Sequence, residues 1–243
     1  MNFYKSYRFK TRNGGSCEVI KYVSHSEVYV KHLDDFGYIS KVRTDRIKSG
    51  SIKNPYSRDV FGVGYLGVGD FKSVFKGGQS LEYRAWNNML QRCYDKNYSR
   101  KNLPSYLNCT VHPDWHNFQN FAEWYTNQEN YGRGYHLDKD ILKTGNTEYS
   151  SKNCCIVPNE INCLYKVMKD STSVGVRGTK DGKYRVYLST NGGSKYLGTF
   201  NSIDEAEECY VKNKRFYVRE VVERNRHKIS EKVYLRLLDD NSP

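Results

Sequence analysis

The sequence predicts a multi-domain α+β protein with a small N-terminal β-barrel, a central ββα unit flanked by helices, and a C-terminal three-stranded antiparallel sheet with a helix. Three observations predict this architecture. Short runs with period-two alternation and turn residues fill both ends of the chain. Apolar residues recur at helical spacing in the middle. A glycine-rich stretch separates the first strands from the first helix.

The N-terminal domain, residues 1–57, reads as short strands of even spacing, which is typical of a small SH3-like barrel. It holds 11 basic and 5 acidic residues, so we expect an accessory module that faces nucleic acid, although a solvated barrel exterior would look the same. The expected strands are residues 9–11, 17–23, 27–32 and 38–42, with a last one near residues 47–52.

Residues 58–80 are predicted to be an extended connector, because they are rich in glycine and poor in helix signals. Within them GVGYLGVG resembles a phosphate-binding loop only superficially. It lacks the GK[ST] ending of a P-loop, and its glycine spacing is not GxGxxG at a strand-to-helix turn. No nucleotide cofactor is therefore expected.

The central region, residues 81–168, begins with an amphipathic helix over residues 80–94, capped by Ser80. A second helix is expected over residues 117–127. Their aromatic stripes are interpreted as core and not as platforms for base stacking. Residues 135–142 then alternate, a turn follows, NCCIVP forms a strand, and a helix opens at Pro158. Strand, loop, strand and helix over about thirty residues match the size of a ββα metal finger.

The C-terminal domain, residues 171–240, has strands at residues 173–178, 183–190 and 195–200, joined by hairpin-type turns. A helix from residue 203 and a short helix capped by Ser230 follow. Alternation places Lys183, Arg185 and Tyr187 on one face of the middle strand.

The charge balance points to a polyanionic partner. The chain carries 39 Lys+Arg against 27 Asp+Glu, a net charge of +12, so nucleic acid is the natural candidate. A solvated basic surface is the plain alternative. Hydrophobic residues are 37% of the chain and the mean hydropathy is −0.82, so we expect no membrane span. The first residues lack a secretory h-region, which favours a cytoplasmic location.

Seven cysteines, an odd number at irregular spacing, argue against a disulfide framework. A zinc site remains conceivable, because two residues separate a cysteine from a histidine near residue 110 and other cysteines could complete a tetrahedral set. The alternative is that these are ordinary core cysteines. The candidate zinc ligands are Cys93, Cys109, His112 and Cys154.

Residues 171–240 resemble the APETALA-type, ethylene-response-factor-like DNA-binding domain, through GVRGTKDGKYRVYL followed by KYLGTFNSIDEAEECY. The resemblance implies a three-stranded sheet that lies in the DNA major groove. Arginine can read guanine edges bidentately and lysine can neutralise phosphates, which suits that role. The contact residues that the resemblance implies are Arg177, Lys183, Arg185, Tyr187, Lys195 and Tyr196.

Residues 82–165 look like the phage-type HNH homing-endonuclease region, with a Trp-containing helix (YRAWNNMLQRCY), a C-x-V-x-x-x-W segment and then the finger. The resemblance depends on the order of these motifs. Together with the N-terminal barrel, it extends over nearly the whole chain. It implies duplex DNA as partner, Mg²⁺ or Mn²⁺ as cofactor, and the cytoplasm of a bacterial host as location. On the HNH pattern Asp138 and Asn153 are metal ligands, Asn162 is the last motif position, and Lys139 stands where the base histidine belongs.

The lysine at the base position departs from the family pattern. An ammonium with a reference pKa near 10.4 cannot accept a proton from water unless that pKa is strongly lowered. Three alternatives stay open. His136 and Asp140, on the same strand face as Asp138, could be a displaced base and an extra metal ligand. Lys139 could stabilise the phosphate charge. The finger could also have lost cleavage and kept DNA binding.

The sequence therefore predicts a metal-dependent DNA endonuclease of the phage HNH type as the leading function. A catalytically inactive, sequence-specific DNA-binding regulator derived from such an enzyme is the alternative. A basic protein-binding module is the third, and it predicts little affinity for duplex DNA at moderate salt. No Ser/His/Asp or Cys/His arrangement supports covalent catalysis.

Overall fold

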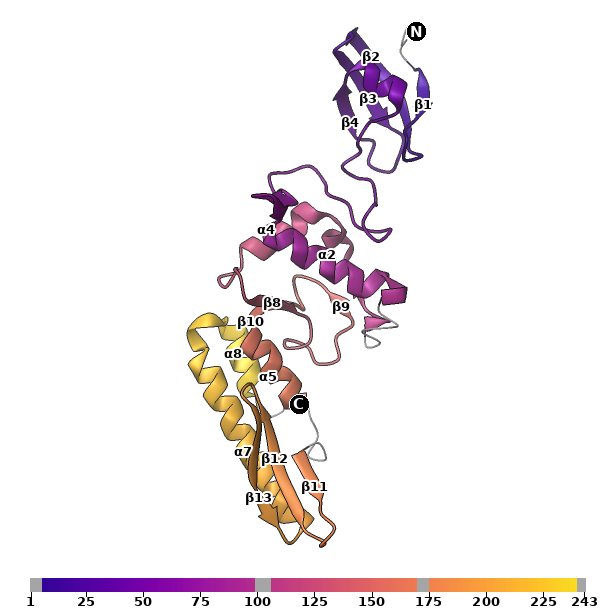
Figure 1. Ribbon diagram of the computed structural model, residues 1–243. Coiled ribbons are helices and arrows are strands. Elements are labelled where there is room, and N and C mark those ends of the chain that lie inside the picture. Colours follow the sequence, from indigo (N-terminus) through magenta and orange to yellow (C-terminus); the bar gives the residue numbers. More distant parts are fainter. Residues whose placement is uncertain (1–5, 99–105, 170–174, 240–243) are drawn as a thin grey trace. The chain divides into compact units, whose positions relative to one another are not determined.

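The computed structural model describes residues 6–98, 106–169 and 175–239 (Figure 1). It shows a mixed α+β protein with several small sheets, nearly all of them antiparallel. The chain divides into two compact units, Met1–Phe71 with His116–Gln119, and Lys72–Trp115 with Asn120–Pro243. Within the three described ranges, no helix has the length and apolar character needed to cross a bilayer.

The first unit is built on a four-stranded antiparallel meander in the order β1-β2-β3-β4. Residues that alternate along β2 and β3 point inward, as the period-two pattern predicts, and Val19, Val28 and Val30 are fully buried. Ile47 and Ile52 complete this core. The strands are β1 Arg8–Lys10, β2 Ser16–Ser24, β3 Glu27–His32 and β4 Ile39–Val42.

The prediction of a strand near residues 47–52 is wrong, because a helix, α1 Thr44–Ser49, lies there. Asp45 sits in its first turn, where a negative charge is favourable. Gly50 ends it in the left-handed conformation, with φ of 65°. Ile47 is nevertheless part of the core. The sequence thus indicated a buried residue correctly, but the backbone around it is helical.

The connector ends in a small hairpin that the sequence did not predict. β5 Val74–Phe75 pairs with β6 Gly78–Gln79. Lys76 and Gly77 at the turn have φ values of 48° and 80°, which suit a type I′ turn. The hairpin leads directly into α2 Leu81–Tyr94, whose predicted cap is confirmed, since Ser80 Oγ accepts the N–H of Tyr83 at 3.2 Å.

The central helices pack through the aromatic faces that their spacing predicts. Trp86 is fully buried in α2 and its Nε1 donates to the carbonyl of Trp115 at 2.7 Å. Trp115 packs edge-on against Phe121, with ring centroids 5.1 Å apart. These rings are core, as expected. The elements here are β7 Thr110–Val111, the 3₁₀ helix η2 Pro113–His116 and α4 Phe118–Thr126.

The predicted strand, loop, strand and helix are present. β8 Tyr135–Asp138 pairs antiparallel with β10 Cys155–Pro158, and α5 Asn159–Lys169 follows at once. Within the long loop, β9 Glu148–Tyr149 pairs in parallel with β7, which local pattern does not reveal. The first strand is shorter than expected, since it stops at Asp138.

The C-terminal part forms the predicted three-stranded antiparallel sheet, in the order β11-β12-β13. Of the first expected strand, residues 173 and 174 lie outside the described residues. Ser230 caps the last helix, as predicted, by accepting the N–H of Val233 at 3.4 Å. The elements are β11 Val176–Gly178, β12 Tyr184–Thr190, β13 Gly193–Phe200, α7 Ile203–Arg224, the 3₁₀ helix η3 Arg226–Lys228 and α8 Glu231–Leu238.

Helix α7 belongs to two cores (Figure 1). Its first half covers the sheet, where Ala206 and Tyr210 pack with Val186 and Leu188. Its second half packs against α5 and α8, and its valines join the buried side chains of the ββα unit. The ββα unit and the C-terminal sheet therefore share one helix and fold as one body.

Candidate functional site

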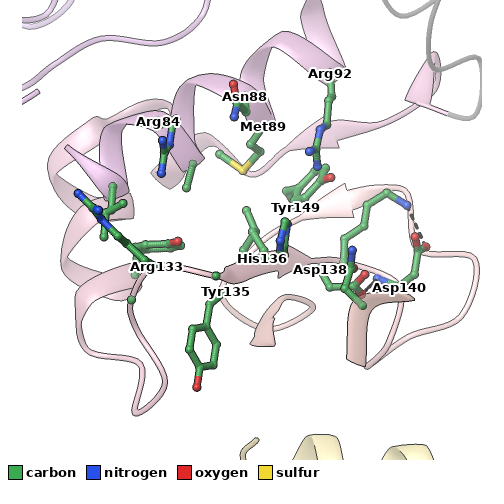
Figure 2. Close-up of a pocket in the computed structure, with 18 of the residues that line it drawn as sticks. Arg84, Asn88, Met89, Arg92, Arg133, Tyr135, His136, Asp138, Asp140 and Tyr149 are labelled. Carbon is green, nitrogen blue, oxygen red and sulfur yellow. Dashed lines mark hydrogen bonds and ion pairs between the residues drawn. The ribbon is translucent and has the colours of Figure 1, made fainter. Parts of the chain in front are cut away.

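A pocket of about 480 Å³ opens between α2 and β8 in the second unit (Figure 2). Both cationic and anionic groups line it. α2 contributes arginines from above, in the view of Figure 2, and β8 contributes a histidine and an aspartate. Its polar lining includes Arg84, Asn88, Arg92, Tyr106, Arg133, His136, Asp138, Lys139, Asp140, Tyr149 and Asn162.

The arginines of this pocket were missed by the sequence reasoning, although α2 carries a signal for them. Arg84, Asn88 and Arg92 are spaced four residues apart and so form one stripe along the helix. That stripe faces β8 in Figure 2. Arg84 and Arg133 are exposed, and neither is ion-paired in the part of the chain that the structure describes. The pocket therefore presents exposed guanidinium groups suited to a phosphate.

Arg92 is held more deeply than the other two arginines. Its guanidinium lies 5.7 Å from the ring centroid of Tyr106 and is hydrogen-bonded to Tyr149. Burial opposes its charge, but the two tyrosines outweigh that effect and raise the pKa of Arg92. Burial in turn raises the pKa of Tyr149 well above its usual value. The deep wall of the pocket therefore keeps a fixed positive charge.

Asp138 ends β8 with its carboxylate turned back onto the chain. Its Oδ1 accepts the backbone N–H groups of Asp140 and Ile141, both at 2.7 Å. Burial raises the pKa of Asp138, although these two donors act in the opposite direction. His136 lies two residues earlier on the same strand and is exposed at the pocket. A carboxylate and an imidazole thus meet in one cavity.

Lys139 lines the pocket and is held by hydrogen bonds within its own loop. It is only 7% exposed, and its Nζ donates to Asp140 Oδ1 at 2.9 Å and to the carbonyl of Asn146 at 2.7 Å. Burial opposes its charge, but the hydrogen bond and charge of Asp140 outweigh it and raise the pKa of Lys139. A raised pKa favours the protonated ammonium, which donates hydrogen bonds and does not act as a base.

The other two proposed metal ligands are engaged in the same loop. Asp140 lies beyond the end of β8, so it does not share the strand face predicted for it, and it is paired with Lys139. Asn153 donates from Nδ2 to Asn146 Oδ1 at 3.4 Å and does not line the pocket. Asn146 itself is buried and donates to the carbonyls of Lys139 and Glu148. Asn162, on α5, does line the pocket.

Three of the four candidate zinc ligands are buried side chains. Cys93, Cys109 and Cys154 are buried, and burial raises the pKa of Cys93 and of Cys154 to about 12. His112 is partly exposed, with Nδ1 3.4 Å from Asp114 Oδ2. Among the described residues, no group of three or more His, Cys, Asp and Glu side chains is arranged to hold a metal ion. The burial of the three cysteines agrees with the alternative of core cysteines.

The C-terminal sheet keeps one face uncovered by α7. Val186 and Leu188 point to the helix, so the alternating Arg185 and Tyr187 point away from it. Tyr196 is paired with Tyr187 across the sheet and is 54% exposed. The guanidinium of Arg177 lies 5.4 Å from the ring centroid of Tyr187. Four of the six predicted DNA contacts therefore share one face.

Of the two lysines in that predicted set, one lies on β13 and the other in the turn before β12. Lys195 is paired with Leu188, and directly paired residues project to the same side, so it belongs to the side of the sheet that α7 covers. Lys183 precedes β12, in the turn where Thr179 N–H donates to its carbonyl at 2.8 Å. A β-bulge opposite the step from Val186 to Tyr187 shifts the register of β13 by one residue.

The pocket offers a divalent cation a small donor set. It comprises the Asp138 carboxylate and the Asn162 amide oxygen. Mg²⁺ is commonly bound by one or two carboxylates together with substrate phosphates and waters. The residues therefore fit an ion completed by a phosphate and do not form an all-protein cage. No family model, no curated protein and no solved structure matches this chain.

Proposed function

We propose that the chain is a phage-type, HNH-like homing endonuclease that binds duplex DNA and hydrolyses a phosphodiester bond with a divalent metal. One observation carries the proposal. A ββα unit brings His136, Asp138 and Asn162 to a single pocket that exposed Arg84 and Arg133 also line. General base, metal ligand and phosphate-binding cations are the groups that such hydrolysis requires. An enzyme of this kind meets its substrate in the cytoplasm of the bacterial host.

Each pocket residue has a role in this reaction. His136 accepts the proton of the attacking water, whose oxygen forms the new bond to phosphorus as the P–O bond to the leaving group breaks. The departing alkoxide takes up a proton from solvent water. Asp138, with Asn162, supplies oxygen ligands, and the bound cation would polarise the phosphate and neutralise its growing charge. Arg84 and Arg133 hold the phosphate through charge-assisted hydrogen bonds.

The open face of the C-terminal sheet supports the DNA-binding half of the proposal. Arg177, Arg185, Tyr187 and Tyr196 are gathered there, on the side away from α7. Arginine beside aromatic rings can contact base edges and phosphates. Because α7 links the sheet to the ββα unit, duplex bound at the sheet is held in a constant relation to the pocket.

A catalytically inactive DNA-binding regulator is the second candidate. A specific observation favours it: Lys139 neutralises Asp140, which leaves Asp138 as the one carboxylate of the pocket that is not ion-paired within the described residues. Fewer anionic ligands weaken the hold on a cation. The same cationic surfaces would then bind DNA without cutting it.

A plasmid-nicking assay with Mg²⁺ or Mn²⁺ separates the two candidates. We expect metal-dependent cutting by the wild type, which EDTA stops. Asp138→Ala should abolish it, and His136→Ala should reduce the rate about 10²–10⁴-fold, the usual contribution of a general base. His112→Ala is the matched control, because His112 is a partly exposed histidine that does not line the pocket.

Duplex affinity is measured beside cutting, by fluorescence anisotropy at several salt concentrations. Affinity that falls steeply with salt, without metal-dependent cutting, would establish the regulator and reject the enzyme. Cutting that survives Asp138→Ala rejects this pocket as the active site. Absence of salt-sensitive duplex binding rejects both candidates.

A further inference from the structure

The β5–β6 hairpin exposes an aromatic ring at its tip. Phe75 is 64% exposed and directly precedes the Lys76-Gly77 turn. Its cross-strand partner is Gly78, which has no side chain to cover the ring. Val74, 61% exposed, comes one residue earlier, so it projects to the opposite side of the two-stranded ribbon. A large apolar group is thus presented to solvent on a short, tight turn.

The charged side chains of the hairpin itself are all positive. Residues 72–79 contain two lysines and no acidic residue. The Nζ of Lys76 lies 5.3 Å from the ring centroid of Phe75, and Lys72 at the base of the hairpin is exposed. An apolar tip with flanking ammonium groups is complementary to stacked bases between two phosphate backbones.

The hairpin is joined directly to the helix that lines the pocket. The N–H of Ser80 donates to the carbonyl of Ser73 at 3.1 Å and closes the hairpin base. The same serine caps α2, and its carbonyl accepts the N–H of Arg84 at 3.0 Å. Arg84, a pocket residue, therefore lies one helical turn from the end of the hairpin.

We propose that Phe75 is a wedge that inserts between two base pairs of duplex DNA, while Lys72 and Lys76 contact the adjacent phosphates. The proposal rests on the duplex-binding part of the proposed function but does not depend on cleavage. Side chains such as Phe, inserted in this way, unstack a base step and bend the duplex. Distortion at the wedge would present a deformed backbone to the pocket one helical turn away.

A membrane surface is the competing partner for an apolar tip flanked by lysines. One phenylalanine ring offers less apolar area than a myristoyl chain, which by itself gives only marginal, reversible membrane binding. The direct connection to an arginine-bearing helix also favours DNA. The membrane is therefore kept as an outcome of the test.

Unwinding of a closed circular plasmid measures insertion without knowledge of the target sequence. The full-length protein is bound at saturation in EDTA, the plasmid is relaxed with a topoisomerase that needs no metal, and the linking number is read after the protein is removed. Wild type should lower the linking number, and Phe75→Ala should lose most of that shift. Phe75→Leu should retain it, because leucine also serves as a wedge.

Val74→Ala is the matched control, since it removes an equally exposed apolar side chain from the other side of the same hairpin. It should leave the shift unchanged. A shift that survives Phe75→Ala, or a wild type that binds without unwinding, overturns the wedge while leaving DNA binding intact. No binding by wild type overturns the proposed function as well. Phe75-dependent co-sedimentation with phosphatidylserine vesicles, without unwinding, assigns the tip to a membrane.

Discussion

At the scale of single residues, Asp138 shows how function and stability compete. Its carboxylate is largely withdrawn from water, and two backbone N–H groups on one oxygen compensate only in part, because its pKa is still raised. A buried charge without a counterion destabilises the folded state. Such a group is retained where its chemistry is needed, which agrees with the role proposed for Asp138 as a metal ligand.

Asp138→Asn should therefore raise the free energy of unfolding at pH 7 by about 1 kcal/mol while abolishing metal-dependent cutting. The amide oxygen can still accept both N–H groups, and the buried charge is gone. The pKa of Asp138 is higher in the folded than in the unfolded protein. Wild type therefore loses stability as the pH rises from the unfolded pKa of this carboxyl group through the folded one. The gain of the variant should thus disappear at acid pH. Urea denaturation at pH 4 and pH 7 tests this, and a loss of stability at pH 7 would contradict it.

At the scale of elements, α7 connects the two hydrophobic cores of the second unit. Its 22 residues contribute Ala206 and Tyr210 to the core of the sheet and Val221 and Val222 to the core of the ββα unit. A helix that is shared by two cores transmits a loss of its own stability to both. Ser202 begins it, with Oγ accepting the N–H of Glu205 at 3.3 Å.

Ser202→Ala removes this cap and should lower the free energy of unfolding by about 0.5–2 kcal/mol, because one N–H at the start of α7 loses its partner. Thermal melting followed by circular dichroism measures the effect. Ser189→Ala is a suitable control, since Ser189 is exposed on β12 and its substitution should change stability by less than about 0.5 kcal/mol. Equal effects of the two substitutions would show that the cap contributes nothing.

At the scale of the whole molecule, a contact between distant segments ties the ββα unit to the C-terminal end of α7. Glu160, in the first turn of α5, is paired with Arg224, and its Oε2 accepts Asn225 Nδ2 at 2.7 Å. Asn225 is only 1% exposed. Burial opposes the charge of Glu160, but the hydrogen bonds from Asn225 and Arg224 outweigh it and lower its pKa.

Glu160→Gln should reduce the free energy of unfolding by about 1–3 kcal/mol at pH 7, because a neutral amide replaces the charged acceptor that Asn225 and Arg224 contact. The folded pKa is below the unfolded one, so this stabilisation is present above the unfolded pKa and disappears as pH falls. Urea midpoints of variant and wild type should converge in acid. Glu123→Gln, at an exposed site on α4, is the control. A difference that persists unchanged in acid would argue against an ionic contribution.

Helices with strong periodicity and a serine cap could be predicted because their signals are local. Ser80 and Ser230 both cap as expected, and Trp86 and Met89 are buried. Short elements could not be predicted in this way. The parallel pair β7–β9 joins segments far apart in the chain. Helix α1 occupies the place of an expected strand, because Ile47 can be buried from a helix as well as from a strand.

The sequence by itself determined the α+β class, the strand, loop, strand and helix order of the central unit, and the strong positive charge, since these follow from periodicity and composition. Only the tertiary structure decided which charged groups share a pocket. Arg133 and Arg84 meet His136 there, whereas Lys139 is enclosed by Asp140 and the carbonyl of Asn146. The physical reason is that desolvation and ion pairing depend on neighbours brought together by folding.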